Sequence, residues 1–329
     1  MRILSIVLLI FFVSLYLYGT SNNITSNVIL QENIEEPEVY FCPDEPCEEI
    51  LIRYINDSNK SIHCALFDLD LEKVIKTLSE KSSKIEVKIV IDNENWDKRF
   101  SGKGIIQDTS SQLSHNKFCI FDEKIVWTGS FNPTNNGANK NNNNIIIIKS
   151  KNLADNYEDE FDELWNYNFG SGRKIKEPII YLNNKKYENY FCPEDHCKQK
   201  VLESIDNAKE SIYFMFFSFT DFDISNALVK KKQEGLEVYG VMEAQRINMQ
   251  YNQYKFLKSN SVDVRKDSNP ATMHHKVIII DNRTTITGSY NPTKAADTKN
   301  DENLLIIHNK EITQKYLEEF KSIFLTSLK

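Results

Sequence analysis

The stretch HHKVIIIDNRTTITGSYN, residues 274–291, decides how the rest of this 329-residue chain is interpreted. Its polar residues follow the spacing H-x-K-x4-D-x6-G-S and end in an asparagine. The stretch HNKFCIFDEKIVWTGSFN, residues 115–132, repeats that spacing without a gap. One H-x-K arises often by chance, whereas two copies with identical spacing do not. The chain therefore contains an internal duplication.

A second repeated unit extends the duplication to most of the chain. Cys42-Pro-Asp-Glu-Pro-Cys47 matches Cys192-Pro-Glu-Asp-His-Cys197 at an offset of 150 residues, from 42 to 192. The two histidine motifs are offset by 159 residues, from 115 to 274. We assign the nine additional residues to a helical segment near Arg246 to Ser259, which the first half shortens.

Each copy alternates between short apolar segments rich in β-branched residues and amphipathic segments. This pattern predicts a mixed, largely buried sheet flanked by helices in each half. The predicted fold class is α/β, with two tandem α-β-α units that form a pseudo-dimer. We place the first unit at residues 25–170 and the second at 171–329, with a linker at Phe169–Lys176. The Asn-rich stretch Asn135–Asn144 is interpreted as a flexible polar loop with little bearing on function.

The N-terminus is apolar from Leu4 to Tyr18, interrupted only by two serines. This length falls between the core of a signal peptide and a membrane span of about 20 residues. We interpret residues 1–24 as a signal peptide or an N-terminal membrane anchor; the alternative is a buried first helix. Either preferred interpretation places the body of the protein outside the cytoplasm, secreted or membrane-anchored.

Six cysteines agree with that location. The two C-P-x-x-x-C units predict two short-range disulfides in an oxidising compartment. A zinc site made from these four thiolates, or from His196 and its neighbours, is a second interpretation, and reduced thiols at a helix start are a third. Cys64 and Cys119 stand alone in apolar segments and are expected to be small buried apolar residues.

Composition limits the classes of function. The chain is 40% hydrophobic and 26% charged, which is enough apolar material for a folded core. Its formal net charge is −7, so the surface as a whole does not attract nucleic acid or anionic membranes. A local basic cleft remains compatible with this charge.

The repeated motifs combine residue types suited to an anionic substrate. At the start of a strand, residues two apart share a face, which pairs His115 with Lys117 and His274 with Lys276. The imidazole can attack or transfer a proton, and the ammonium can neutralise charge on oxygen. Hydroxyl and amide donors expected to bind phosphate oxygens follow each motif: Ser130, Asn132, Ser289 and Asn291.

Asp122 and Asp281 complete the motifs. We expect them to orient the catalytic groups rather than react, and the alternative is that they close a hairpin turn. His275 should point away from the face of His274.

These residues resemble the phospholipase D superfamily, whose mark is a paired HKD motif. The sequence from Gly288 to Ala296, continuing to Glu302-Asn303, is most similar to a small branch that includes bacterial HKD endonucleases and mitochondrial cardiolipin hydrolases. The resemblance implies that two units form one active site and that this chain supplies both without an obligate protein partner. It also implies a phosphohistidine intermediate, with no cofactor and no metal.

The two halves differ at one informative position, because Glu302 precedes Asn303 whereas Asn143 precedes Asn144. If Glu302 lies near His274, its charge should favour the imidazolium and make His274 the general acid. His115 would then be the nucleophile.

The nature of the substrate is left open by the sequence. A membrane phosphodiester is slightly favoured by the apolar N-terminus and the acidic net charge. An endonuclease, with a basic rim of Lys140, Lys294 and Lys299, is the alternative, and an inactive phosphate-binding scaffold is the third.

Overall fold

The computed structural model of the chain describes residues 30–97 and 104–328. The predicted signal peptide or anchor at residues 1–24 lies outside these ranges. Residues Gln31–Lys329 form one compact unit that contains both repeats. None of the helices in the described ranges combines the length and hydropathy needed to cross a bilayer.

The first repeat builds a seven-stranded sheet in the order β2-β8-β7-β6-β3-β4-β5. The pair β3–β4 is parallel and β3–β6 antiparallel, so the sheet is mixed as predicted. Its strands are β2 (Glu38–Cys42), β3 (Ser61–Leu66), β4 (Glu86–Ile91), β5 (Ile105–Gln107), β6 (Lys117–Phe121), β7 (Ile125–Gly129) and β8 (Asn143–Lys149).

The second repeat builds a nine-stranded sheet in the order β1-β9-β10-β16-β15-β14-β11-β12-β13. From β10 onward this is the first sheet repeated, and β9 adds an antiparallel hairpin to β10. The strand β1 precedes the first repeat in the chain but belongs to this second sheet. The strands are β1 (Leu30–Glu32), β9 (Ile179–Leu182), β10 (Lys185–Cys192), β11 (Ser211–Phe216), β12 (Glu237–Met242), β13 (Asp263–Lys266), β14 (Lys276–Ile280), β15 (Thr284–Gly288) and β16 (Glu302–Ile307).

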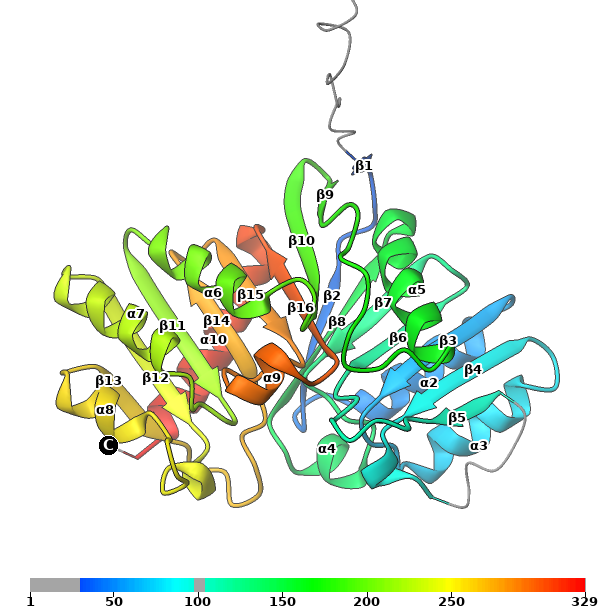
Figure 1. Cartoon of the computed structure of the whole chain (residues 1–329), viewed down its shortest axis with the longest axis horizontal. Helices are drawn as coiled ribbons and strands as arrows, with labels where there is room; N and C mark the ends of the chain where they lie inside the picture. Colours follow the sequence, from blue (N-terminus) through cyan, green and yellow to red (C-terminus); the bar gives the residue numbers. More distant parts are fainter. Residues whose placement is uncertain (1–29, 98–103, 329) are drawn as a thin grey trace, which may run out of the picture. The chain divides into compact units, whose positions relative to one another are not determined.

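Helices flank both sheets, as Figure 1 shows. Because successive side chains of a strand face opposite ways, Ile62 and Cys64 join the core beneath α2 and α3, whereas His63 stacks on Phe161 of α5. The helical elements are α2 (Cys47–Asp57), α3 (Glu72–Lys81), η1 (Asn93–Asn95), α4 (Asn135–Asn139), α5 (Lys151–Trp165), α6 (Cys197–Asp206), α7 (Phe222–Gln233), η3 (Ala244–Arg246), α8 (Tyr254–Ser259), α9 (Lys294–Thr298) and α10 (Lys310–Thr326).

The two halves are joined by matching contacts. Tyr157 of α5 packs edge-on against Phe191 of β10, with ring centroids 5.1 Å apart. The equivalent pair, Phe41 of β2 and Tyr316 of α10, is 5.3 Å apart. Aromatic pairs of this geometry add stability beyond the area that they bury. The repeats therefore form the pseudo-dimer that the duplication predicted.

All six cysteines are paired. The disulfides Cys42–Cys47 and Cys192–Cys197 confirm the short-range prediction and replace the zinc interpretation. The expectation for Cys64 and Cys119 was wrong, because these two residues also form a disulfide. They lie directly opposite each other on the antiparallel pair β3–β6, with Cα atoms 4.1 Å apart. Strand register decides this pairing, and spacing along the sequence does not reveal it.

The interpretation of Asn135–Asn144 as a flexible loop was also wrong. Its first half forms helix α4, whose N-cap Thr134 accepts a hydrogen bond from the backbone N–H of Gly137. Its end begins strand β8, where the side chains of Asn143 and Asn144 are fully buried. Buried amides need partners, and the partners of these two residues lie in the candidate site.

Candidate active site

His115 lies just before β6, and its backbone is held by the other half of the molecule. Its N–H donates to the carbonyl of Asp301 over 2.9 Å. Its ring Nδ1 lies 2.7 Å from Oε2 of Glu302, at the start of β16. The Ser289 hydroxyl donates to the same carboxylate oxygen over 2.7 Å. Glu302 is fully buried, so His115 faces a fixed carboxylate from the second repeat.

His274 occupies the equivalent position, with first-half partners. Its N–H donates to the carbonyl of Asn142 over 2.9 Å. Its Nδ1 lies 3.0 Å from the carbonyl of Ser130 and 2.9 Å from Oδ1 of Asn143. Since both partners are acceptors, Nδ1 carries the proton and Nε2 is left for chemistry. Each histidine is thus oriented by the half that does not contain it.

The expected contact between Glu302 and His274 is therefore wrong. The carboxylate contacts His115, and the neutral amide of Asn143 occupies the matching place beside His274. The reason is the crossing of partners between halves, which sequence offsets within one half do not show. The carboxylate therefore lies beside the predicted nucleophile and not beside the predicted acid, so the argument that gave His274 the acid role through Glu302 no longer holds.

The two lysines are buried beside the histidines on the predicted face. Each Nζ donates to the carbonyl of the histidine two residues earlier, over 2.7 Å for Lys117 and 2.8 Å for Lys276. Lys117 lies 4.9 Å from the ring centre of Phe67, and Lys276 lies 4.9 Å from that of Phe217. The same rings contact His115 and His274 edge-on, at 4.8 and 4.6 Å. These two phenylalanines were not singled out by the sequence.

Burial governs the charges of the site. It lowers the pKa of Lys117 to about 7 and that of Lys276 well below its ordinary value. It also lowers the pKa of both His115 and His274, and the nearby lysines add to that effect. Burial raises the pKa of Glu302 to about 8, against the opposing charge of Lys117. An anionic substrate would relieve this crowding of cations, which suits the site to a phosphodiester.

The glycines of the two Gly-Ser steps are required by the packing of neighbouring strands. Gly129 and Gly288 have φ values of +143° and +136°, and a Cβ on either would lie 2.2 Å from the carbonyl oxygen of Asn144 or Asn303. Glycine is therefore required for contact with the neighbouring strand, and not for approach to phosphate.

The serines that follow are fully buried and already bonded. The hydroxyl of Ser130 donates to Asn143 over 3.1 Å, as that of Ser289 does to Glu302. In this structure they position the partners of the two histidines, and their role as phosphate donors stays a prediction.

Asn132 and Asn291 follow the serines at equivalent places. Oδ1 of Asn132 is buried without a hydrogen-bond partner, and Oδ1 of Asn291 accepts from the backbone N–H of Ser218 over 3.3 Å. No described hydrogen bond uses the amide nitrogen of either residue, so both nitrogens stay candidates for substrate contact.

Asp122 and Asp281 do not orient the histidines. Each lies in the turn after a five-residue strand, about 17 Å along the strand from its motif lysine. Oδ1 of Asp122 accepts from the backbone N–H of Lys60 over 2.7 Å, and Oδ1 of Asp281 accepts from that of Glu210 over 2.7 Å. Both have positive φ, at 54° and 52°. The hairpin alternative describes them, and their role is to join β3 to β6 and β11 to β14.

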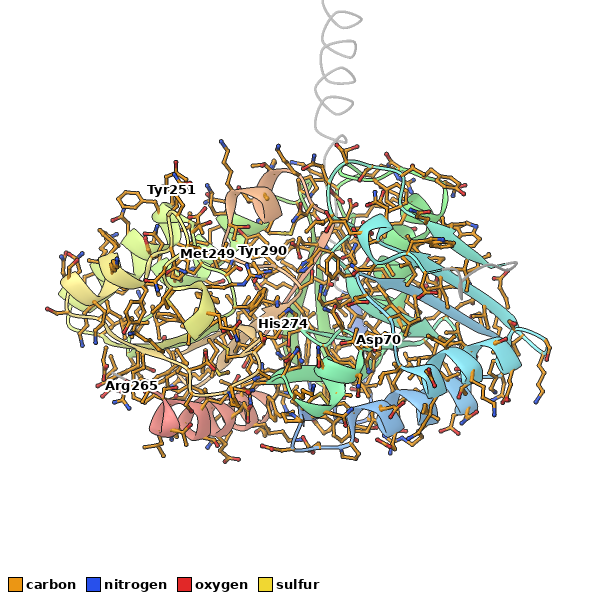
Figure 2. The ribbon with its side chains drawn as sticks, turned by 90° about the horizontal axis from the view of Figure 1, so that it is seen from below. Asp70, Met249, Tyr251, Arg265, His274 and Tyr290 are labelled. Atoms are coloured by element: carbon orange, nitrogen blue, oxygen red, sulfur yellow. A yellow bond between two sulfur atoms is a disulfide. The ribbon has the colours of Figure 1, made fainter. Side chains whose placement is uncertain are left out.

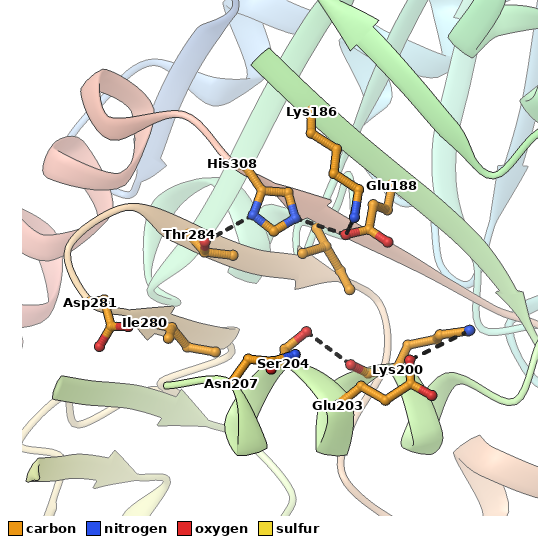
Figure 3. A pocket seen from close by; sticks show the side chains of 11 residues that line it. Lys186, Glu188, Lys200, Glu203, Ser204, Asn207, Ile280, Asp281, Thr284 and His308 are labelled. Atoms are coloured by element: carbon orange, nitrogen blue, oxygen red, sulfur yellow. Dashed lines mark hydrogen bonds and ion pairs between the residues drawn. The ribbon is translucent and has the colours of Figure 1, made fainter. Parts of the chain in front are cut away.

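Asp281 instead lines a pocket at the opposite end of the second sheet, shown in Figure 3. The charged groups there bind one another: Nε2 of His308 lies 2.7 Å from Glu188, and Lys186 lies 2.8 Å from the same carboxylate. The equivalent pocket of the first half contains Asp122. A pocket repeated in both halves with paired charges is a consequence of the fold.

Two further carboxylates support the site and were missed. Asp92 accepts from the backbone N–H of Ser114 over 2.8 Å, and Glu243 accepts from that of Met273 over 2.7 Å. Each therefore anchors the residue immediately before a motif histidine. A lone acidic residue at the end of a β-branched strand is the only signal in the sequence.

With the fold and this geometry in place, comparison with known proteins gives the family. The family described as "Cardiolipin synthase, PLD-like domain" matches residues 51–165 and 201–324, once in each repeat. The chain belongs to this phospholipase D-like family.

Characterised relatives match less than half of the chain. Phospholipase D of Rickettsia felis is 34% identical over 151 residues, which are 46% of this chain and 76% of that protein. Human mitochondrial cardiolipin hydrolase is 33% identical over 125 residues, 38% of this chain and 50% of that protein. These relatives support a phosphodiesterase hydrolase.

A solved structure matches both repeats together. The crystal structure of phosphatidylserine synthase from Haemophilus influenzae has a TM-score of 0.67 over 87% of this chain and 85% of that one, at 13% identity. This likeness concerns the fold.

Proposed function

We propose that the protein hydrolyses phosphodiesters through a covalent intermediate on His115. The observation that supports this most is the pair of buried histidines whose Nδ1 atoms are fixed by the opposite halves, beside two buried lysines. This arrangement provides a nucleophile, a proton donor and two cations for a phosphoryl group.

The difference between Glu302 and Asn143 supports different roles for the two histidines. Glu302 can stabilise the positive charge that develops on His115 when its Nε2 attacks phosphorus. As that bond forms, the ester bond to the leaving oxygen breaks, and His274, which enters the step as an imidazolium with a second proton on Nε2, gives that proton to the leaving oxygen. Asn143 carries no charge, so His274 is the stronger acid of the two. Water then gives a proton to His274 and attacks phosphorus, which releases His115 and a phosphomonoester.

We propose a membrane phospholipid as the preferred substrate. Exposed apolar side chains of the second half support this choice: Phe222, Met249 and Tyr251 are 56%, 50% and 73% exposed. The sulfur of Met249 lies 3.6 Å from Arg246, which stacks on the site ring Phe217. Figure 2 shows Tyr251 at the outer edge of the second half and His274 nearer the middle. Such side chains can enter a lipid interface beside a pocket for the head group.

Location outside the cytoplasm remains part of this proposal. The three disulfides support it, because disulfides persist in oxidising compartments.

An endonuclease is the second candidate. Lys140, Lys294 and Lys299 are exposed on or just after the short helices α4 and α9, and none of the ion pairs found in the described residues includes them. These lysines could contact a nucleic-acid backbone.

The test uses the purified full-length chain in mild detergent with EDTA, beside His115→Ala. Vesicles of mixed phospholipids, single- and double-stranded DNA, and RNA are offered separately. Release of a head group by the wild type, but not by the variant, supports the phospholipase proposal. Cleavage of nucleic acid by the wild type alone supports the endonuclease and would replace the phospholipase proposal. If every substrate stays intact while the protein is folded, the proposal of catalysis is wrong and a phosphate-binding scaffold takes its place. Steep loss of activity with salt would also indicate nucleic acid.

A further inference from the structure

Besides Glu302, the two halves differ at the candidate site in a charged side chain to which the proposed reaction gives no role. Arg246, at the end of η3, places its guanidinium carbon 3.9 Å from the ring centre of Phe217. That ring also contacts His274 at 4.6 Å and Lys276 at 4.9 Å. Burial lowers the pKa of Lys276 most, and the charges of Lys117 and Arg246 lower it further. Arg246 is therefore a third cation at the site, and sequence analysis did not identify it.

Within residues 30–97 and 104–328, the position of the first half that matches Arg246 carries an asparagine. Asp92 and Glu243 begin the two equivalent 3-10 turns, so Asn95 at the end of η1 corresponds to Arg246 at the end of η3. Nδ2 of Asn95 donates to the carbonyl of Phe67 over 2.9 Å. Asn95 thus contacts the backbone of Phe67, whereas Arg246 lies over the aromatic ring of Phe217.

Most N–H donors of the Arg246 guanidinium have no hydrogen-bond acceptor among the described residues. None of the ion pairs in residues 30–97 and 104–328 includes it, and its one described hydrogen bond is the weak contact with the sulfur of Met249. The nearby carboxylate of Glu243 accepts from the backbone N–H groups of Gln245 and Met273. Guanidinium presents five N–H donors in a planar fork that suits phosphate oxygens.

Symmetry indicates which part of a substrate Arg246 would meet. The groups that occur in both halves (histidine, lysine, asparagine and phenylalanine) can serve the scissile phosphate, which lies between them. A side chain that occurs in only one half, such as Arg246, would instead contact one of the two different substituents that are esterified to the phosphate. We call these two substituents the ester arms. The opposite arm would meet Asp68, the counterpart of Ser218, which adds negative charge near Lys117. The site therefore has a cationic and an acidic side.

We propose that Arg246 determines specificity by binding a second phosphate carried on the leaving-group arm, the side of His274. The inference rests on the function proposed above and names its substrate class: phosphodiesters with a second phosphate close to the scissile one. A lipid in which one glycerol joins two phosphates has this chemistry, and so has a nucleic-acid strand.

The experiment compares matched substrates on the full-length protein. Diphosphatidylglycerol is compared with phosphatidylglycerol in vesicles, and the dinucleotide TpT with its phosphorylated form pTpT. Bis(p-nitrophenyl) phosphate, which has no second phosphate, measures the basic reaction. The variants are Arg246→Gln and Arg246→Lys, with Arg283→Gln as the control, because Arg283 is exposed in the β14–β15 turn outside the candidate site.

We expect Arg246→Gln to lower kcat/KM about 10- to 100-fold on whichever doubly charged substrate is cleaved, with a clearly smaller loss on its singly charged match. Arg246→Lys should restore part of this difference, and Arg283→Gln should resemble the wild type. Whichever pair of substrates is cleaved, the two lipids or the two dinucleotides, shows whether the second phosphate belongs to a lipid or to a nucleic acid. Equal losses on both members of the pair, or no wild-type preference for the second phosphate, would overturn the proposal.

A binding measurement separates this proposal from the catalytic one. Propane-1,3-bisphosphonate and propylphosphonate are titrated calorimetrically into the wild type and Arg246→Gln. We expect the bisphosphonate to bind more tightly only when Arg246 is present. If bis(p-nitrophenyl) phosphate is not hydrolysed but this difference is seen, the proposed catalysis fails while the second-phosphate site stands. If bis(p-nitrophenyl) phosphate is hydrolysed but the bisphosphonate and the monophosphonate bind equally well, the second-phosphate site is wrong and the proposed catalysis stands.

Discussion

Replacing Glu302 with glutamine tests the difference between the two histidines directly. The change keeps the size of the side chain and an acceptor for Nδ1 of His115, now 2.7 Å from the carboxylate, but removes the negative charge. A hydrogen bond to a buried charged group contributes about 1.5–3 kcal/mol to stability. Because the imidazole of His115 becomes cationic as it attacks phosphorus, the charged bond to Glu302 stabilises the transition state more than the ground state. The corresponding loss in kcat is roughly 10- to 150-fold.

Asn143→Asp is the matched opposite change, because it places a carboxylate against His274. That charge should raise the pKa of His274 and weaken it as an acid. The loss should be large for an alkoxide leaving group, which needs a proton, and small for p-nitrophenolate, which does not. Glu302→Gln should slow both substrates, since both require attack by His115.

The assay combines steady-state rates with alkaline rapid quenching and peptide mapping of the phosphohistidine. In the wild type we expect the phosphoryl group on His115. Phosphohistidine found on His274, or Glu302→Gln activity within about threefold of wild type, would refute the assignment, because a charge-assisted bond of this kind must cost more.

Three further outcomes follow from the structure. Lys117 has a pKa lowered to about 7 and loses its charge above that pH, whereas the pKa of Glu302 is raised to about 8 and its negative charge is lost below that pH; because the proposed reaction uses both charges, kcat/KM should peak between about pH 7 and 8, and an activity that still rises above pH 9 would contradict this. Asp281→Ala removes an acceptor for three backbone N–H groups and should reduce the free energy of unfolding in urea by about 1–2 kcal/mol, with specific activity of the folded protein unchanged. The double variant Cys64→Ala and Cys119→Ala removes a disulfide that closes a 55-residue loop, and should lower the free energy of unfolding by about 3–4 kcal/mol in the same assay. Labelling of Cys64 and Cys119 as free thiols in the unreduced wild type would disprove the pairing.

The sequence predicted the parts of this molecule that repeat. Two copies of one spacing led to two sheets in one chain, and period-two alternation correctly placed His115 with Lys117 and turned His275 away, toward Glu319 at 3.2 Å. Short-range disulfides were predictable because both cysteines lie within one turn and helix start.

What the sequence did not reveal depends on contacts between distant segments. The Cys64–Cys119 disulfide requires the register of β3 on β6, and the Glu302–His115 contact crosses 187 residues. A buried amide such as Asn143 looks like any other asparagine in a polar run until its partner is known. Such pairings follow from tertiary packing, which local propensity and spacing do not encode.

The crossing of partners also explains why both halves belong in one active site. A histidine whose orientation depended on its own repeat would be complete in a single unit, and the second motif would be redundant. Here Asp301 and Glu302 hold His115, and Asn142 and Asn143 hold His274. Fusion of the repeats then allows one partner to differ from the other without a change in the fold. In the proposed mechanism, a carboxylate on one side and an amide on the other make one imidazole the nucleophile and the other the acid, which a symmetric pair of units cannot do by itself.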